Sequence, residues 1–419
     1  MKFEKLTEKE FNKFSKNHPQ ASFFQTVETA NLRKIYGSKI HFLGIKEKDK
    51  ILAAAMFTET TTFMKKKTFY APRGFLIDYN DKKLLNFFTK ELIKYVKKYN
   101  CFQIKIDPNV IYQVHANDGS LIDGAKKEDE IIENLKSLGY QHYGFNLDFK
   151  YTQSRWNFLV TLDKEYEELK QSFSKSTRKN IESTYNKGVR VRKAKENDFE
   201  SMEDILLKTA ERKQFAARDL EYYKNMKKCL KDLMNIYIAY LDADIYLESS
   251  IQLLEKEKQH NKEILAKMEK DMVGSKLKNQ KETSDKLLEK LTNEVEIAKK
   301  FKEENPKGLD IGVLISVESG QEYITLYSGI LMEYKKFTPK YLMYDAHIRD
   351  CYEKKIKYAN FYGISGIFDP KDKDYGMFEF KRGFGGNVVE LIGEFSYPLG
   401  ISYNLYVLLR NLKRKINRW

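Results

Sequence analysis

Residues 242–307 read DADIYLESSIQLLEKEKQHNKEILAKMEKDMVGSKLKNQKETSDKLLEKLTNEVEIAKKFKEENPK, and this charged stretch interrupts a chain that is otherwise typical of compact domains. Apolar residues recur at alternating short spacings on either side of Gly274 and Ser275, which form the expected turn. This spacing is the seam of a coiled coil, and the Lys, Glu and Gln between the seam positions solvate the outer faces. The stretch therefore predicts an antiparallel coiled-coil hairpin, which we call the arm.

Each half of the arm has its own seam. The first seam consists of Leu247, Ile251, Leu254, Lys258, Asn261, Leu265, Met268 and Met272, and the second consists of Leu277, Lys281, Ser284, Leu288, Leu291, Val295 and Ala298. Two helices alone bury too little apolar surface for independent stability, so the arm must be rooted in a domain. At a rise of 1.5 Å per residue it would reach about 40 Å, far enough to contact a partner. The alternative is a solvated strut that binds nothing.

The composition limits the classes of protein to which the chain can belong. Its 419 residues suffice for two domains plus the arm. A hydrophobic fraction of 42%, with 14% aromatic residues, excludes global disorder. A formal net charge of +15 predicts an anionic partner, such as RNA, a phosphorylated substrate or a membrane surface. Charge alone does not choose between these three.

Cysteine and histidine usage argues against disulfides and metals. Cys101, Cys229 and Cys351 are odd in number and far apart, which favours a reducing compartment. The histidines show no ligand spacing, and no phosphate loop ending in Gly-Lys-Ser or Gly-Lys-Thr is present, so we predict no metal site and no nucleotide-driven chemistry. The sequence has no signal core and no spanning run of ~20 apolar residues. We therefore expect a cytoplasmic protein whose membrane contact is at most peripheral.

One arrangement of elements occurs twice along the chain: a hairpin, an amphipathic helix, and a strand that ends in polar groups. The first copy comprises residues 40–45, 51–58, 82–99 and 101–106, and the second comprises residues 311–317, 323–326, 341–358 and 360–362. This order is typical of an acetyltransferase-like unit. We therefore predict an α/β (α+β) fold of two tandem acetyltransferase-like domains, with the arm inserted in the second.

The predicted domain boundaries follow from this repeat. The first domain covers residues 1–150, the second covers residues 151–241 and 308–395, and the arm covers residues 242–307. Residues 396–419 include an amphipathic basic tail, which packs on the first domain or lies on a membrane surface.

Three local patterns add further expectations. Residues 71–74, Ala-Pro-Arg-Gly, contain too many turn formers for regular structure. Residues 166–188 predict one helix with a dense basic face, and residues 388–395 predict one strand. The basic face includes Lys175, Arg178 and Lys179, which are candidates for contacts with RNA.

Cations stand beside aromatic residues at predicted loop and strand ends. They are Arg73 after a strand, Arg218 before Tyr222 and Tyr223, and Lys381 after Phe380, with Tyr362 at the end of another strand. A cation beside an aromatic face is suited to hold a phosphate and to stack a base or sugar. Each pair alone is compatible with a structural role, but together they predict a phosphorylated ligand.

Residues 382–386, Arg-Gly-Phe-Gly-Gly, superficially match the loop that binds the pyrophosphate of coenzyme A in acetyltransferases. Such a loop works by opening a helix whose N-terminal amides hold the phosphates. Here the glycines precede a β-rich run, so we expect a glycine turn that joins strands and no coenzyme A.

A series of short motifs also runs through the chain. They are Leu6-Thr7-Glu8-Lys9-Glu10-Phe11, Phe24-Gln25-Thr26, Arg73-Gly74, Ile106-Asp107-Pro108, Arg178-Lys179-Asn180, Arg218-Asp219, Asn360-Phe361-Tyr362-Gly363, Phe380-Lys381-Arg382-Gly383-Phe384 and Glu390-Leu391-Ile392-Gly393-Glu394-Phe395. Through these motifs the chain resembles the FemABX family of peptidoglycan bridge-forming aminoacyltransferases over nearly its whole length. The resemblance implies two acetyltransferase-like domains with an inserted coiled coil, and an arm that helps to engage tRNA.

The resemblance also implies roles for single residues. The precursor-binding positions of the family map onto Arg33, Arg218 and Tyr222, with Tyr223 as the alternative for the tyrosine. Arg33 stands where close relatives carry lysine, which keeps the charge and changes the donor geometry. The lysine of the family's Phe-Lys pair maps onto Lys381, which we expect to stabilise charge near the reacting ester or the terminal tRNA phosphate.

The implied reaction is attack by the amine of an acceptor residue on the activated ester of aminoacyl-tRNA, the cosubstrate, without a further cofactor. Positioning and stabilisation of the developing oxyanion can supply most of the catalysis. Asp107, at a strand end, is either a proton acceptor or, with Pro108, part of a structural turn.

The expected function is transfer of glycine or serine to the interpeptide bridge of the lipid-linked peptidoglycan precursor, at the inner face of the cell membrane. One alternative is an immunity version that inserts serine against a glycyl-glycine endopeptidase. Another is a non-enzymatic RNA-binding adaptor, which would have no deep pocket between the domains and no lysine in it. The sequence leaves open the amino acid, the bridge position, and whether the chain forms a homodimer or a hetero-oligomer with related transferases.

Overall fold

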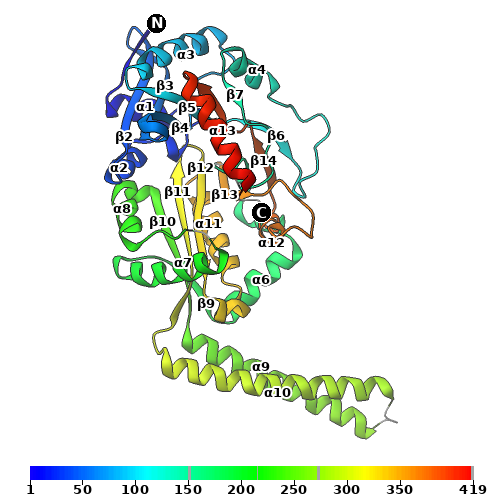
Figure 1. Ribbon diagram of the computed structural model, residues 1–419. Helices are drawn as coiled ribbons and strands as arrows, with labels where there is room; N and C mark the ends of the chain where they lie inside the picture. The colour runs from blue at the N-terminus through cyan, green and yellow to red at the C-terminus, as the bar shows by residue number, and fades with distance from the viewer. Residues whose placement is uncertain (150–151, 215, 271–273, 417–419) are drawn as a thin grey trace.

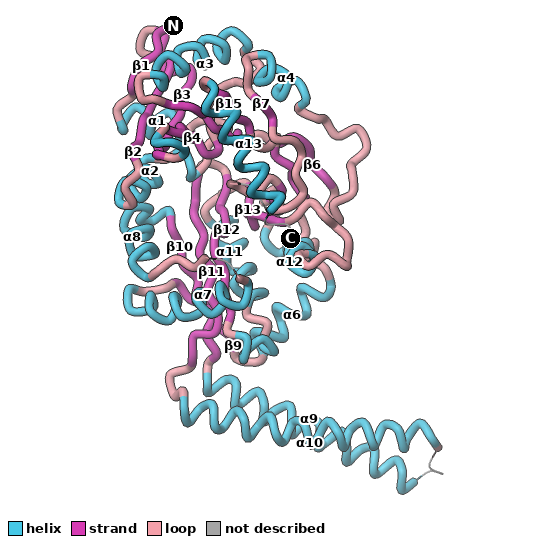
Figure 2. Tube along the Cα trace, in the orientation of Figure 1, coloured by secondary structure: helices cyan, strands magenta, loops and turns pink. Residues whose placement is uncertain are grey.

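The structure is a computed structural model that describes residues 1–149, 152–214, 216–270 and 274–416. In this part of the chain two β-sheets are flanked by helices, and a pair of long helices projects away from both sheets (Figure 1). Figure 2 shows the strands of both sheets in magenta between the cyan helices. The prediction of a mixed α/β fold is confirmed.

The first sheet has the strand order β1-β2-β3-β4-β5-β15-β7 in the described residues. Its strands are β1 (Lys2–Lys5), β2 (Lys39–Glu47), β3 (Lys50–Thr61), β4 (Lys67–Arg73), β5 (Cys101–Pro108), β15 (Phe395–Pro398) and β7 (Gln141–His142). The α-helices around it are α1 (Glu8–Lys16), α2 (Val27–Ile35), α3 (Lys82–Lys97), α4 (Asp129–Ser137) and α13 (Ile401–Ile416). Leu85, Phe88 and Leu92 of α3 are fully buried against the sheet, as their periodic spacing predicts.

The second sheet has the order β6-β14-β8-β13-β12-β11-β10-β9 in the described residues. Its strands are β6 (Ile111–His115), β14 (Asn387–Leu391), β8 (Trp156–Thr161), β13 (Tyr358–Ile364), β12 (Glu322–Ile330), β11 (Leu309–Ser319), β10 (Met234–Leu241) and β9 (Val189–Lys193). Its α-helices are α5 (Tyr166–Gln171), α6 (Lys175–Asn186), α7 (Phe199–Lys213), α8 (Leu220–Leu230), α11 (Lys340–Glu353) and α12 (Tyr375–Arg382). Apolar cores lie on both faces of this sheet, one with α11 and one with α7 and α8.

The two sheets are linked by strands from opposite ends of the chain. β6 follows β5 directly but pairs with β14 in the second sheet, whereas β15 follows β14 and pairs with β5 in the first. Each sheet contains a parallel pair, β4 with β5 and β12 with β13, among otherwise antiparallel neighbours. This exchange brings the end of β4 close to β8 and β13. The domain boundaries inferred from the sequence stay predictions.

The prediction that residues 71–74 are irregular is wrong for most of that segment. β4 continues to Arg73 and pairs in parallel with β5, with Arg73 opposite Pro108. Proline is tolerated in a strand where its nitrogen is not needed as a ladder donor, and Pro72 still supplies a carbonyl acceptor, to Gln25 Nε2 at 2.7 Å. Long-range pairing therefore overrides the local turn signal.

The prediction of one helix over residues 166–188 is also wrong, because α5 and α6 are separate helices. Ser174 begins α6 by accepting a hydrogen bond from Thr177 N at 3.1 Å, and Ser174 N donates to Gly383 O at 2.8 Å. Since the break depends on a segment far away in the chain, local periodicity could not indicate it.

Residues 388–395 do not form one strand. β14 ends at Leu391 in the second sheet, and β15 begins at Phe395 in the first. Gly393 lies between them with φ of +91°, a conformation that favours glycine. The glycine marks the place where the chain passes from one sheet to the other.

The arm consists of two helices, α9 (Ala243–Lys270) and α10 (Ser275–Glu304), which pack against each other along their length (Figure 1). The positions predicted for the second seam are all at least partly buried in α10. The first seam is wrong at Ile251 and Leu265, which are 40% and 41% exposed while the adjacent Ser250 and Ile264 are buried, and at Lys258, which is also exposed. Met272 lies outside the described residues.

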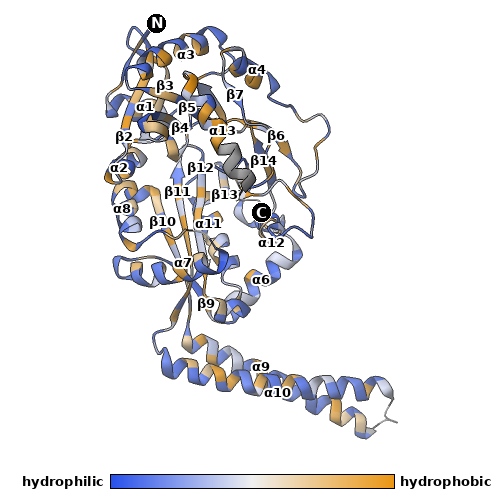
Figure 3. Cartoon of the chain, in the orientation of Figure 1, coloured by the Kyte–Doolittle hydropathy of each residue, from blue (hydrophilic) through white to orange (hydrophobic). Residues whose placement is uncertain are grey.

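The predicted polar seam positions Asn261 and Ser284 meet between the two helices. Asn261 Nδ2 donates to Ser284 Oγ and to Asp285 Oδ1, each at 2.9 Å, between the two helices. A polar layer of this kind fixes register at some cost in stability. Figure 3 shows mostly hydrophilic residues along both helices, with hydrophobic residues between them.

The root of the arm packs into the apolar core that the second sheet forms with α11. The Tyr246 ring lies 5.7 Å from the Phe301 ring and 5.0 Å from the Phe337 ring, centroid to centroid. Glu294 of α10 accepts hydrogen bonds from Tyr246 OH at 2.5 Å and Lys336 Nζ at 2.7 Å. Aromatic packing and a half-buried ion pair therefore fix the direction in which the arm projects.

The C-terminal helix α13 packs one side on the first sheet, with the Tyr406 ring 5.4 Å from the Phe102 ring. Its other side leaves Ile401, Leu405 and Leu408 exposed. Residues 417–419 of the predicted tail lie outside the described part. Within that part, no helix combines the length and the apolar content needed to cross a membrane.

Candidate functional site

The ends of β4 and β13 meet where the two sheets come together. Arg73 ends β4 with φ of 54°, and Tyr362 lies in β13 with φ of 58°, a left-handed conformation that is uncommon for residues other than glycine. The Arg73 guanidinium donates a hydrogen bond from Nη2 to Ser154 O at 2.6 Å, and it lies close enough to Tyr362 to oppose the rise that burial causes in the pKa of that tyrosine. Such backbone conformations are most frequent at functional sites.

A break in strand pairing accompanies the strained tyrosine. The register of β13 against β8 shifts between Asn360 and Gly363, and Tyr362 N donates to Asn360 Oδ1 at 2.7 Å. Bulges of this kind redirect side chains and are enriched beside active sites. The Tyr362 hydroxyl also donates to Gln153 Oε1 at 2.6 Å, so the ring is held at both ends.

Asp107 lies beneath this contact and is 2% exposed. Its Oδ1 accepts a hydrogen bond from Arg73 N at 2.8 Å, and its Oδ2 accepts one from Tyr70 OH at 3.1 Å. Burial raises the pKa of Asp107 to about 6, and the nearby Arg73 charge opposes that rise. Both carboxyl oxygens therefore hold other protein groups in place, and a role as proton acceptor stays a prediction.

Lys381 approaches the same region from the last turn of α12 and is 5% exposed. Its Nζ donates to Gly363 O at 2.7 Å and lies 3.4 Å from Tyr362 O. Burial lowers the pKa of Lys381 to about 7, with a smaller contribution from the charge of Lys340. No carboxylate of the described residues pairs with Lys381. We call Arg73, Asp107, Tyr362 and Lys381 the junction cluster.

A second group of predicted residues gathers where α2 meets α8. Arg33 Nη1 donates to Thr58 Oγ1 at 2.9 Å, and burial lowers the pKa of Arg33 although Tyr70, Tyr222 and Asp107 oppose that shift. The guanidinium of the exposed Arg218 lies 4.8 Å from the centroid of the Tyr222 ring. Arg33, Tyr222 and Arg218 therefore form a cationic and aromatic wall beside the junction cluster.

The structure separates the two tyrosines that the sequence could not distinguish. Tyr222 is partly exposed and lies beside the cations, whereas Tyr223 is 3% exposed and packs 5.6 Å from the Tyr327 ring. Tyr222 is thus the member of the pair that a ligand can reach.

Phe380 and the basic helix lie on the side of Lys381 away from the first sheet. Phe380 is half-buried, and its ring centroid lies 5.1 Å from that of Tyr341 and 5.0 Å from that of Tyr344. It packs against the core that the second sheet forms with α11. Lys175 and Lys179 are exposed on α6. The main-chain hydrogen bond from Ser174 to Gly383 places the start of α6 beside the end of α12.

The guanidinium of Arg178, on the same helix, bonds to Gln171 O at 3.0 Å and to Gln171 Oε1 at 2.6 Å. Lys175, Arg178 and Lys179 together therefore form a basic surface that begins close to Lys381.

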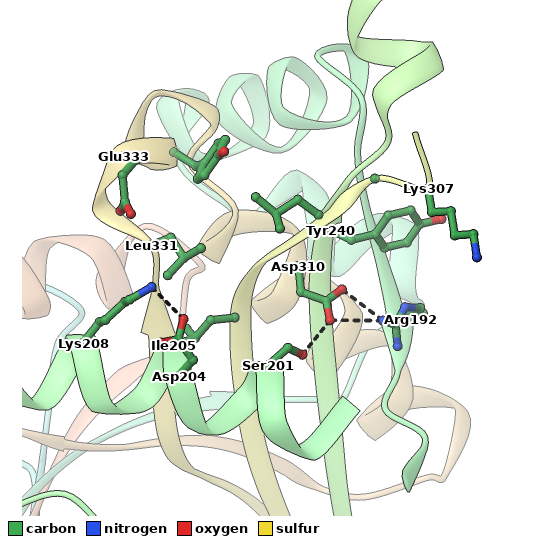
Figure 4. A pocket seen from close by; sticks show the side chains of 13 residues that line it. Arg192, Ser201, Asp204, Ile205, Lys208, Tyr240, Lys307, Asp310, Leu331 and Glu333 are labelled. Atoms are coloured by element: carbon green, nitrogen blue, oxygen red, sulfur yellow. Dashed lines mark hydrogen bonds and ion pairs between the residues drawn. The ribbon is translucent and has the colours of Figure 1, made fainter. Parts of the chain in front are cut away.

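A hollow of about 740 Å³ lies elsewhere in the described residues, at the root of the arm (Figure 4). None of the predicted site residues lines it. Its charged groups are largely paired within the wall, as in Arg192 with Asp310 at 3.0 Å and Lys208 with Asp204 at 2.7 Å. Volume alone therefore does not identify the site, whereas the burial of Asp107 and Lys381 and their shifted pKa values point to the junction cluster.

Sequence reasoning missed Tyr70, Asn157, Glu322 and Asn360, which all lie at or beside the junction. Asn157 and Asn360 interrupt apolar runs, Trp-Asn-Phe-Leu-Val and Tyr-Ala-Asn-Phe-Tyr. A polar side chain in an otherwise buried strand was the signal that could have indicated them.

Comparisons with known proteins agree with this arrangement. The model of the FemAB family matches residues 6–413. The aminoacyltransferase FemA of Staphylococcus epidermidis is 33% identical over 99% of this chain and 100% of its own length, and FemA of Staphylococcus aureus is 30% identical with the same coverage. The crystal structure of FemX superposes with a TM-score of 0.76 at 24% identity, over 97% of this chain and 99% of that one.

Proposed function

Since the chain belongs to the FemAB family, we propose that it moves glycine from aminoacyl-tRNA to the interpeptide bridge of the lipid-linked peptidoglycan precursor. The protein is a transferase enzyme. The observation that carries the proposed chemistry is the position of Lys381. It is a buried cation held by two main-chain carbonyls, and no carboxylate of the described residues neutralises it.

Lys381 stabilises the negative charge that develops on the ester carbonyl, or the terminal phosphate of the tRNA. Electrostatic interactions are stronger in a buried site than in water, and a group that is already in place needs no reorganisation during the reaction. The lowered pKa of Lys381 also gives the site a dependence on pH near neutrality.

The remaining members of the junction cluster position the substrates. Arg73 N donates to Asp107 and the Arg73 guanidinium donates to Ser154 O, so this pair links the end of β4 to the segment that precedes β8. Tyr362 presents its backbone carbonyl to Lys381 and its ring to the junction. We assign these residues to positioning, with Phe380 supporting Lys381 from the core side.

The wall formed by Arg33, Arg218 and Tyr222 binds the phosphates and sugar of the precursor. Guanidinium groups pair with phosphate oxygens in two-point contacts, and an aromatic face covers a sugar. Arg33 lies close enough to Asp107 and Tyr70 for their charges to affect its pKa, so bound phosphates would lie next to the reaction site.

The tRNA approaches over α6 and the arm. Lys175, Arg178 and Lys179 supply cations for backbone phosphates, starting beside Lys381 and continuing outward. We propose that the arm is a coiled coil that contacts the tRNA at a distance from its acceptor end, and that both sheets derive from acetyltransferase-like units. Aminoacyl-tRNA is then the cosubstrate, and no further cofactor takes part.

The exposed apolar side of α13 supports peripheral contact with the inner face of the cell membrane, where the lipid-linked precursor resides. A cytoplasmic protein that associates with this surface, as a homodimer or with related transferases, fits the function.

Two alternatives differ in what they need from the junction cluster. A non-enzymatic RNA-binding adaptor has no use for a buried, unneutralised lysine, so the position of Lys381 argues against it. An immunity enzyme that inserts serine uses the same site and differs only in the amino acid delivered.

The test is transfer by the purified protein to the lipid-linked precursor, followed by mass spectrometry of the product. We expect addition of one glycine from glycyl-tRNA and none from free glycine with ATP. Addition from seryl-tRNA alone would favour the immunity version, and addition from neither tRNA would contradict the proposal.

A further inference from the structure

A small cavity of about 210 Å³ lies on the second sheet, next to the junction cluster, where strands of that sheet face Pro19, Ala21 and Asn109. Its polar wall carries Asn109, Asn157, Glu322 and Asn360, from the segment after β5 and from β8, β12 and β13. Sequence analysis indicated none of these residues, and the roles proposed above leave them unused.

Glu322 is an acid without a counter-ion. Its Oε2 accepts a hydrogen bond from Asn360 Nδ2 at 2.9 Å, and no Lys, Arg or His of the described residues lies within ion-pair distance of its carboxylate. Burial raises the pKa of Glu322, and the more distant Arg73 only opposes this rise. A cation bound in the cavity would complete this interaction.

Asn157 supplies a second free acceptor on the same wall. It is 3% exposed, and its Oδ1 has no hydrogen-bond partner among the described residues. Buried amide oxygens are almost always bonded, so an orphaned one beside a cavity indicates a missing donor. The two acceptors together suit a group with several N–H donors.

Gln321 and Tyr358 add further polar groups to the wall, and the remainder is apolar. This apolar part consists of Pro19, Ala21, Ile111, Leu159, Val389 and Leu391. A methylene or glycyl segment packs against such a surface, whereas a free inorganic cation would leave it wet. The cavity is therefore shaped for a charged nitrogen on a short apolar stem.

The cavity is close to Lys381 by strand register. Asn157 in β8 pairs with Gly363 in β13, and the carbonyl of Gly363 accepts the hydrogen bond from Lys381. Asn360, on the cavity wall, also holds the backbone N of Tyr362. Directly paired residues lie about 5 Å apart, so Asn157 on the cavity wall is the cross-strand neighbour of the residue that Lys381 contacts.

We infer that this cavity binds the acceptor primary amine of the precursor, as an alkylammonium or glycylammonium group, between Glu322 and Asn157. The inference rests on the proposed transferase function and adds the place of the nucleophile. Glu322 and Asn157 bind the amine, and Asn360 positions Glu322 through its amide.

The chemistry balances with these groups. The bound ammonium gives one proton to the Glu322 carboxylate and becomes the neutral amine. Its nitrogen forms a bond to the ester carbonyl carbon, the bond from that carbon to the ribose oxygen breaks, and the second nitrogen proton passes to that oxygen. An amide and a free ribose hydroxyl result, without a further reactant.

Binding can be measured without any transfer. We expect Nα-acetyl-lysine or glycylglycine, used as a probe, to bind the full-length protein at millimolar concentration in a calorimetric titration. Preference for the lysine derivative would indicate a side-chain amine as acceptor, and preference for the dipeptide a glycyl amine. Glu322→Gln should weaken binding of the preferred probe at least tenfold.

The matched control is Glu318→Gln, which changes an exposed glutamate of the same hairpin that pairs with Lys354 at 2.7 Å. It should leave binding unchanged. Asn157 lies in a central strand, so its replacement can disturb folding. The binding result for Asn157→Leu is therefore used only if the melting temperature of this variant is close to that of the wild type. Otherwise the test rests on Glu322→Gln alone.

In the transfer assay, Glu322→Gln should raise the KM for the precursor at least tenfold while the KM for aminoacyl-tRNA stays within twofold. A structural defect would change both constants, and failure of the proposed function would abolish transfer by the wild type as well. Probe binding that is absent in the wild type, or unchanged by Glu322→Gln, would overturn the inference.

Discussion

The junction cluster and the arm place charged residues in opposite settings. Arg73 and Asp107 are 4% and 2% exposed, and their contacts join β4 to β5 and to Ser154, which lies just before β8 of the second sheet. The side chains of Lys286 and Glu282 in the arm are 73% and 65% exposed and lie one helical turn apart. Buried charges that lose a partner cost several kcal/mol, whereas exposed pairs contribute little. Burial, and not the number of charges, therefore decides where a charged residue controls stability and chemistry.

The largest expected effect is on catalysis. Lys381→Ala should lower the rate of transfer at least ~100-fold, as loss of one oxyanion-stabilising donor does in other enzymes. Lys286→Ala, in the arm, should leave the rate unchanged. Comparison of transfer rates at saturating substrates, with melting temperatures as the check on folding, would refute the role of Lys381 if both variants behaved alike.

This contrast also explains what the sequence could reveal. The arm, α3 and the hairpins depend on neighbours a few residues away, and periodicity indicated them. The phase of α9 was wrong where Ser250 and Ile264 are buried in place of the adjacent Ile251 and Leu265, and apolar character alone does not distinguish Ile264 from Leu265.

The site depends on distant contacts. The break between α5 and α6 requires Gly383, and the role of Lys381 requires carbonyls from β13. Motif resemblance indicated Lys381, but no local pattern could show that Glu322 and Asn157 line one cavity.

The second prediction concerns stability. Asp107→Ala removes the acceptor of Arg73 N and leaves the guanidinium without its nearby carboxylate, so it should lower the free energy of unfolding by about 4 kcal/mol. Lys286→Ala, which removes an exposed pair, should lower it by less than about 0.5 kcal/mol. Urea denaturation followed by circular dichroism measures both values, and equal losses would contradict the difference between the two regions.

The third prediction uses pH. Burial raises the pKa of Asp107 from 3.8 to about 6, so the folded protein keeps this proton over a range in which the unfolded chain loses it. The free energy of unfolding should therefore fall, by up to about 3 kcal/mol, as pH rises from about 4 to about 6. Asp107→Asn should remove this fall.

Ionisation of Asp285 in the arm should change the free energy of unfolding in the opposite direction. Hydrogen bonds from Lys281 and Asn261 lower its pKa, so its contribution is present at neutral pH and is lost as pH falls. If Asp285→Asn and Asp107→Asn shifted the pH profile of unfolding in the same direction, the opposite pKa shifts assigned to these two carboxyl groups would be wrong.

The smallest expected effect comes from shortening the arm. Removal of residues 254–289, with a short Gly-Ser turn joining the remaining helices, keeps Tyr246, Glu294 and Phe301 at the root. The KM for aminoacyl-tRNA should rise about tenfold, equivalent to about 1.4 kcal/mol, while the KM for the precursor stays unchanged. An unchanged KM for aminoacyl-tRNA would show that the arm is a strut.

The most direct test of the account compares the shortened-arm protein with Lys381→Ala in one transfer assay, in which aminoacyl-tRNA is raised to saturation. We predict that saturation with aminoacyl-tRNA restores the transfer rate of the shortened protein to nearly that of the wild type. The Lys381→Ala protein should stay at least ~100-fold slower. The assignment of chemistry to the junction cluster would be contradicted if the shortened protein stayed slow at saturation and the Lys381→Ala protein recovered its rate.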